Sequence, residues 1–264
     1  MNLLIRTGRS FFALGIIGIA LQQFQYGELR PVVFPEWPAG WQASAAAAYI
    51  VGFVLIVASV FILMGRKGEQ ASLGLARFFL LMFIAFHFVY LVFFNPNSFH
   101  LGSWSNALKA LALSGGSLIM AASFLQESQP ADKKSPLTRA TEKMIPAGRV
   151  FFSITLILFG IDHFIYTEFV ATLVPSWIPG HYFWTYFAAV ALIASGICII
   201  FKIQLKTVAL LTGVMLLIWL LVLHIPRAVA DPHGDKGNEV TSVFEALNFA
   251  GIALVLAGVK KSSI

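Results

Sequence analysis

The sequence predicts an all-α fold: a polytopic membrane protein with eight transmembrane helices, arranged as two parallel-repeat four-helix bundles. Two observations predict this class. Hydrophobic residues make up 58% of the 264 residues and charged residues 11%, whereas about a quarter of the residues of a soluble domain are charged. In addition, residues 8–41 align with residues 148–181 without a gap. The composition excludes a soluble enzyme with one large core.

The repeat is supported by identical residues at identical offsets. Eleven aligned pairs match, whereas sequences of average composition would match at about two positions by chance. Further along the chain, His87 aligns with His224. Two copies of one structural unit therefore lie in one chain. The predicted boundaries are residues 1–125 for the first unit, 126–147 for a cytoplasmic linker and 148–264 for the second unit.

Each unit contains four apolar segments, and most of the eight are close to the ~20 residues that cross the hydrocarbon layer of a bilayer. The first segment is short. In chain order, the breaks are a proline-containing loop, a basic turn, a polar loop and the linker, and then the same three kinds of break again. Because each unit has an even number of helices, the second unit starts on the same side of the membrane as the first. The two units therefore have the same orientation, and their pseudo-twofold axis runs along the membrane normal. The predicted helices cover residues 9–24, 45–64, 71–94, 105–125, 148–166, 183–201, 207–225 and 242–259.

Lysine and arginine fall mainly on one side of this topology. Fourteen of the eighteen occur at the N-terminus, around the second and sixth loops, in and next to the linker, and in the C-terminal tail. Because cytoplasmic loops carry an excess of Lys and Arg, we expect both termini in the cytoplasm and the protein in a bacterial cytoplasmic membrane, with the lipid bilayer as a partner. This positional bias also accounts for the net charge of +6, so no nucleic-acid partner is predicted. The single cysteine, Cys198, excludes an intramolecular disulfide.

The two units differ most in a polar segment near the outer end of their first helix. Where the first unit has two glutamines, the second has Asp162 and His163. Tyr166 lies four and three residues further on, so these side chains can meet on one helical surface. Ionisable residues in membrane segments are candidates for function. Together with His224, which ends the seventh helix at a similar depth, they form the predicted catalytic group. The alternative is a helix end that anchors the following loop through hydrogen bonds.

A second set of residues, His87, Glu168 and Trp177, is predicted to contact a bound quinone or lipid. Histidine titrates near physiological pH, so His87 could relay a proton or contact a quinone. Its presence in both units also favours an interhelical hydrogen bond. Glu168 precedes a proline-containing loop and could instead anchor it. Trp177 belongs to a P-x-W-x-x-G motif that recurs in both units. We expect this motif to form a short interfacial segment over the outer mouth of each bundle, with a polar pocket beneath it only in the second unit.

No metal site is predicted. Residues 224–239 include three acidic residues and two histidines, but their spacing matches no tight zinc or calcium motif. A solvated loop is the simpler interpretation, although metal binding by the outer histidines stays open. Lys109 and Glu245 occupy equivalent positions near the outer starts of the fourth and eighth helices. We expect these two side chains to pair across the two bundles.

The stretch from residue 160 to residue 179 carries a pattern of nine residues: Gly160, His163, Phe164, Glu168, Phe169, Val174, Pro175, Trp177 and Pro179. This pattern resembles the first-helix signature of the DoxX-like membrane proteins. The first unit resembles a degenerate copy of the signature, with Gln23 in place of the histidine. The resemblance implies four-helix units and an association with redox systems such as thiosulfate:quinone oxidoreductase subunits.

Three functions are consistent with these features. The first is a redox-linked membrane subunit that binds a quinone near His163, Tyr166 and His224. It would need a separate soluble or membrane redox partner, because the chain has no haem, flavin or cysteine-cluster motif. The alternative is a non-enzymatic scaffold or lipid-binding protein, which a duplication with one degenerate copy fits equally well. A small-solute transporter is a further alternative that parallel repeats permit. Whether the protein is an enzyme stays open, as does its oligomeric state.

Overall fold

A computed structural model describes residues 2–38, 42–127 and 134–264 of the chain. Within these ranges every regular element is helical, which confirms the all-α prediction. Eight helices in this part of the chain are long and apolar enough to span a membrane, as predicted. Gly40, which completes the loop motif of the first unit, and residues 128–133 of the predicted linker lie outside the described residues.

Four of the eight spans are single α-helices. The largest difference from the prediction is in the first of them, which begins at Leu3 rather than at residue 9 and is not short. The Asn2 side chain caps this helix by accepting a hydrogen bond from the Leu4 amide at 3.0 Å. The four are α1 (Leu3–Tyr26), α2 (Ala45–Met64), α7 (Ile145–Ile165) and α9 (His181–Ile200).

The other four spans are composite. The third joins α3 (Gly68–Leu81), a π-helical turn η1 (Met82–Phe88) and α4 (Val89–Phe93). The seventh joins α10 (Leu205–Trp219), a π-helical turn η3 (Leu220–His224) and α11 (Ile225–Ala230). A short 3-10 turn, η2 (Leu101–Trp104) or η4 (Gly234–Lys236), precedes α5 (Ser105–Leu125) and α12 (Asn238–Gly258).

The two π-helical turns occur at equivalent positions of the sequence repeat. One contains His87 and the other ends at His224. Such turns are rare and are frequent at functional sites. Their recurrence supports the duplication beyond the aligned residues 8–41 and 148–181.

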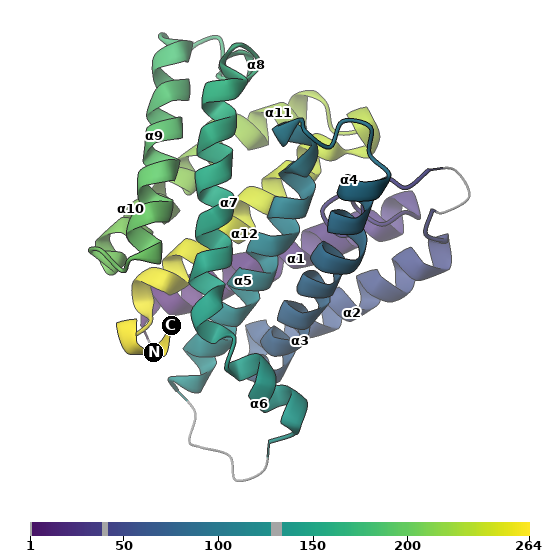
Figure 1. Ribbon diagram of the computed structural model, residues 1–264, viewed down its shortest axis with the longest axis vertical. Helices are drawn as coiled ribbons and strands as arrows, with labels where there is room; N and C mark the ends of the chain where they lie inside the picture. The colour runs from purple at the N-terminus through teal and green to yellow at the C-terminus, as the bar shows by residue number, and fades with distance from the viewer. Residues whose placement is uncertain (1, 39–41, 128–133) are drawn as a thin grey trace.

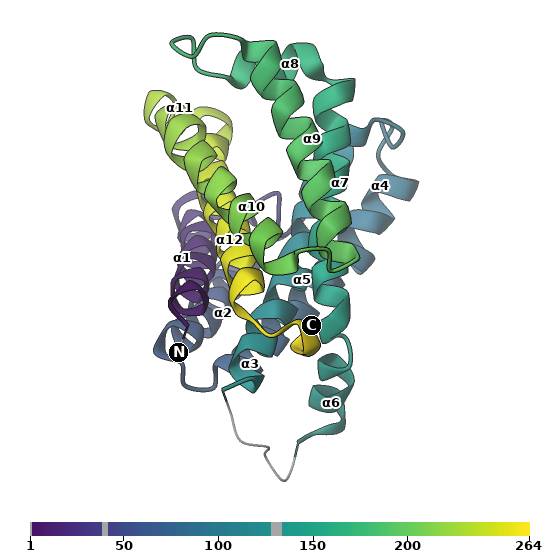
Figure 2. The ribbon, with the colours of Figure 1, turned by 90° about the vertical axis from the view of Figure 1, so that its left-hand side faces the viewer.

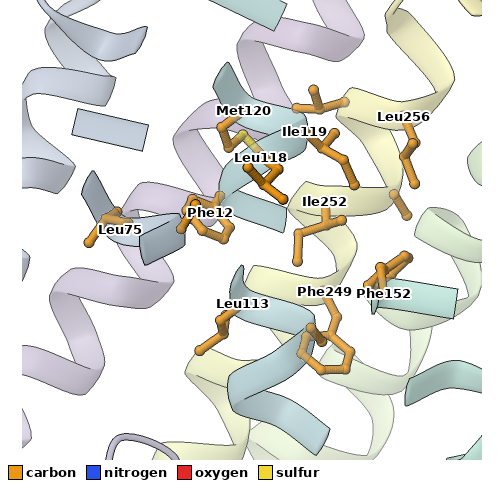
Figure 3. Packing of buried hydrophobic residues seen from close by; sticks show 14 of the residues in the cluster. Phe12, Leu75, Leu113, Leu118, Ile119, Met120, Phe152, Phe249, Ile252 and Leu256 are labelled. Atoms are coloured by element: carbon orange, nitrogen blue, oxygen red, sulfur yellow. The ribbon is translucent and has the colours of Figure 1, made fainter. Parts of the chain in front are cut away.

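The central helices of the molecule are α5 and α12, which contact each other and are the most buried spans. Helices α3 and α7 pack on α5, and α1 and α10 pack on α12, while α2 and α9 lie against α1 and α7 (Figure 1). Figure 3 shows part of the shared core, where Phe12 of α1, Leu118 of α5 and Ile252 of α12 come together.

The first helix of each unit packs closely against the last helix of the other unit. A Cβ atom at Gly8 of α1 would lie 2.6 Å from the carbonyl oxygen of Gly251 in α12. In the same way, a Cβ atom at Gly115 of α5 would lie 2.5 Å from the carbonyl oxygen of Gly148 in α7. Small residues allow membrane helices to approach this closely. Extensive contacts therefore cross the sequence boundary between the two units, at equivalent places in each.

The two ends of the helical bundle differ in what they carry. Both termini and α6 (Pro136–Glu142), a short helix in the linker, lie at one end, hereafter the α6 end (Figures 1 and 2). At this end Lys134 forms an ion pair with Glu69 at 2.8 Å, which ties the linker to α3. The opposite end carries α8 (Thr167–Leu173) and α11 and is hereafter the α8 end (Figure 2).

Candidate functional site

A cavity of about 450 Å³ lies in the second unit toward the α8 end. Small-molecule sites have volumes of roughly 300–1,000 Å³. Helices α7, α9, α10 and α12 supply most of its wall, and the segment Val170–Ile178 covers its mouth. Figure 2 shows α7 and α9 diverging from α10 and α12 in this direction.

The lining of the cavity is largely apolar. Leu156 and Phe159 of α7, Leu192 of α9, Trp219 of α10 and Phe249 of α12 face it. A polar pocket was expected only beneath the second loop motif, and this was wrong. A polar cavity of about 460 Å³ instead borders the loop of the first unit at Glu28, Arg30 and Trp37. The pocket beneath the second motif is present, but it is apolar. The physical reason is the helical rotation of α7, which turns His163 toward the cavity and its polar neighbours away from it.

His163 is one of two imidazoles in the cavity wall. Its Nδ1 lies 2.7 Å from the carbonyl oxygen of Phe159, one turn earlier on α7. A carbonyl oxygen can only accept, so Nδ1 must carry the hydrogen of this bond. In the neutral ring the lone pair is then on Nε2. The local helix geometry therefore leaves His163 with an Nε2 that can accept a proton or a hydrogen bond.

His224, the last residue of the π-helical turn η3, is the second imidazole of the wall. Lys109 of α5 and Glu245 of α12 also line the cavity, and their side chains form an ion pair at 2.7 Å. This confirms the predicted pairing of the two residues. Because each charge is compensated by the other, the pair adds polarity to the wall without adding net charge.

The mouth of the cavity is formed by α8 and the residues that follow it. Trp177 lines the mouth and is 70% exposed. Glu168 lies at the start of α8 and accepts a hydrogen bond from the Tyr182 hydroxyl at 2.8 Å. This bond ties α8 to α9, which agrees with the anchoring alternative for Glu168.

The predicted catalytic group is divided by the structure. His163 and His224 line the cavity, whereas Asp162 and Tyr166 are not among its lining residues. They face the first unit, where the Tyr166 ring stacks on His100 with centroids 4.7 Å apart and His100 lies close to Asp162. One buried oxygen of Asp162 has no hydrogen-bond partner among the described residues. Consecutive residues of an α-helix project about 100° apart, so Asp162 and His163 serve different surroundings.

In the first unit the equivalent positions are buried. Gln23 replaces His163 and is completely buried, and His87, the counterpart of His224, is only 2% exposed. His87 lies beside the backbone of Val32 and Val33, which are also buried completely. The predicted cofactor contact at His87 is therefore not part of the cavity.

Sequence reasoning missed several lining residues, among them Trp219, Trp184 and Thr185. Trp219 lies five residues before His224, a spacing that does not place two side chains together on a regular α-helix. The intervening π-helical turn changes that register, and the sequence carries no clear signal for it. Lys109 was recognised as a partner of Glu245 but not as part of a site, because it belongs to the first unit.

Among the described residues, no group of three or more His, Cys, Asp or Glu side chains could hold a metal ion. Comparisons with protein-family models, with curated proteins and with solved structures find no match to this chain.

Proposed function

We propose that this protein is a quinone-binding, redox-linked membrane subunit that works with a separate electron-carrying partner. The observation that carries the proposal is the placement of His163 and His224 in the wall of one apolar cavity. The resemblance of residues 160–179 to the DoxX-like signature supports the same function. The distribution of Lys and Arg supports a bacterial cytoplasmic membrane, with the α6 end in the cytoplasm and the cavity mouth on the outer side.

The chemistry of the wall fits a quinone. A quinone ring presents two carbonyl oxygens or, when reduced, two hydroxyl groups. The isoprenoid chain of a quinone matches the apolar side chains around Leu192 and Phe249. A bound quinone supplies two-electron, two-proton redox chemistry. His163 Nε2 is placed to accept a hydrogen bond or a proton from a hydroxyl group. The compensated charges of Lys109 and Glu245 suit an uncharged ring.

The proposal is tested by binding of decylubiquinone to the protein in lipid nanodiscs. Trp184 and Trp219 line the cavity, so saturable quenching of tryptophan fluorescence reports occupancy. His224→Gln should weaken binding at least tenfold. His87→Gln is the matched control, because it makes the same change at the equivalent buried position, and it should leave binding unchanged. The proposal fails if gently solubilised protein contains no quinone and decylubiquinone causes neither saturable quenching nor thermal stabilisation.

A lipid-binding scaffold is the second candidate, and the largely apolar lining favours it. Mass spectrometry of ligands that co-purify with the protein separates the two. A phospholipid or fatty acid that remains bound to the His163→Gln variant would support the scaffold, because an acyl chain needs no imidazole. A quinone that is lost from that variant would support the redox subunit.

A further inference from the structure

The loop that follows the first helix lies in a different position in each of the two units. After α1, the chain turns back on itself, with the Val33 and Phe34 amides donating to the Arg30 carbonyl oxygen at 2.8 and 3.0 Å. This turn buries Val32 and Val33 completely, and Trp37 is only 8% exposed. The loop of the first unit is thus folded into the bundle.

Trp37 is held by aromatic residues at the outer end of the third span. Its ring centroid lies 5.6 Å from that of Tyr90 and 5.1 Å from that of Phe94. Phe34, in the same loop, packs on Phe86 at 4.9 Å. Together with the contact between His87 and the Val32–Val33 backbone, these side chains cover His87. The second cavity, of about 460 Å³, borders this loop at Phe34 and Trp37, but His87 is not among its lining residues.

In the second unit the equivalent residues lie over the mouth of the cavity instead of inside the bundle. Thr172 and Leu173, the counterparts of Val32 and Val33, are exposed and half-buried. Trp177, the counterpart of Trp37, is 70% exposed. His224 faces the cavity instead of a loop backbone. The cavity therefore exists where the loop of the first unit would be.

We propose that residues 167–178 form a plug that moves between the open position described above and a closed position like that of residues 27–38. The two segments share a glutamate, a proline and a tryptophan at equivalent positions. Closure requires α8 to unwind, and it is strained at Thr167, which stands where Gly27 has a φ of 65°. In the closed position, Thr172 and Leu173 lie against His224. Trp177 then lies at Arg227 and Asp231, the counterparts of Tyr90 and Phe94 in the repeat.

The differences between the units explain why the histidine lines a cavity in the second unit, at His224, and is covered by the loop in the first, at His87. The closed loop of the first unit buries two valines and Trp37, whose ring packs on Tyr90 and Phe94. In the second unit, a threonine replaces one valine, and Arg227 and Asp231 replace the two rings that hold the tryptophan. The Arg227 guanidinium already donates a hydrogen bond to the Glu239 carboxylate, so it holds a tryptophan ring less firmly than Tyr90 and Phe94 hold Trp37. The plug of the second unit therefore has a less stable closed position.

Ligand binding and closure exclude each other, because the plug side chains take up the volume that a ligand needs. A ligand of the cavity binds only the open state and shifts the population toward it. The inference depends on the proposed function only for the identity of that ligand. The movement of the plug does not depend on the proposed function.

The test uses cysteine pairs in a Cys198→Ser background, in lipid nanodiscs, with a short bismaleimide cross-linker. The test pair is Trp177→Cys with Asp231→Cys, and the matched control is Trp37→Cys with Phe94→Cys. We expect the control pair to cross-link fully with or without decylubiquinone. The test pair should cross-link partially without decylubiquinone and at least threefold less when it is saturating. Cross-linked test protein should no longer bind decylubiquinone.

A second measurement keeps Trp177 intact. Spin labels on Ser176→Cys and Asn238→Cys, both at exposed positions, should give two distances, of which decylubiquinone removes the shorter. A single distance under all conditions, with no cross-linking of the test pair, overturns the plug. If decylubiquinone does not bind at all, the proposed function fails, while two distances without ligand still establish the movement. Binding that leaves both readouts unchanged contradicts the exclusion of ligand by the plug.

Discussion

Gly8 of α1 and Gly251 of α12 bring two helix backbones into direct contact, since a Cβ atom on Gly251 would lie 2.7 Å from the Gly8 carbonyl oxygen. Gly148 and Gly115 do the same for α7 and α5. The two contacts fix the walls of the cavity. Helix α7, which carries His163, is held on α5, and α12, which carries Glu245, is held on α1.

Replacing Gly148 by alanine should destabilise the protein by about 1–3 kcal/mol, because the added methyl group overpacks a backbone contact. Gly74→Ala is the control, since a Cβ atom there meets nothing within 4 Å and alanine favours a helix over glycine by roughly 1 kcal/mol. Thermal unfolding in detergent should lower the Tm of the first variant and preserve or raise that of the second. Equal effects of the two substitutions would show that α5 and α7 are not in close contact.

Lys109 and Glu245 provide a test of the cavity wall. Lys109→Met leaves the Glu245 carboxylate, which is largely buried, without its partner. Removing one member of such a pair costs about 3–5 kcal/mol. The double variant with Glu245→Leu removes both charges and should recover most of this loss. A double-mutant cycle on thermal stability measures the coupling, and a coupling near zero would mean that the ion pair does not form in the membrane.

The sequence was sufficient for the number of spans and for the Lys109–Glu245 pair, because the first depends on composition and the second on equivalent positions of the sequence. It was not sufficient for the direction in which neighbouring side chains face. Asp162 and His163 are adjacent in the chain, yet they lie on different sides of α7, which is set by packing against α5. The different burial of Trp37 and Trp177 was also invisible, since both stand in the same motif.

Asp162→Asn should therefore leave decylubiquinone binding within about twofold of the unmodified protein, whereas His163→Gln should weaken it at least tenfold. The physical reason is that Asp162 faces the His100 side of α7 and the His163 ring faces the cavity. Fluorescence titrations in nanodiscs give both affinities. If Asp162→Asn weakens binding as much as His163→Gln does, both residues act at the binding site, as the sequence predicted.

The orientation in the membrane decides whether the cavity opens to the outside. Leu137 in α6 and Asn238, which begins α12 eight residues after the end of α11, are both exposed. Helices α6 and α11 lie at opposite ends of the molecule (Figure 2). In a Cys198→Ser background, a membrane-impermeant maleimide applied to intact cells should label Asn238→Cys and not Leu137→Cys. Permeabilised cells should show labelling of both, which controls for accessibility. The expectation follows from the excess of Lys and Arg at the α6 end. The reverse pattern would place the mouth of the cavity, with Trp177, in the cytoplasm, and the electron-carrying partner would then have to be sought there.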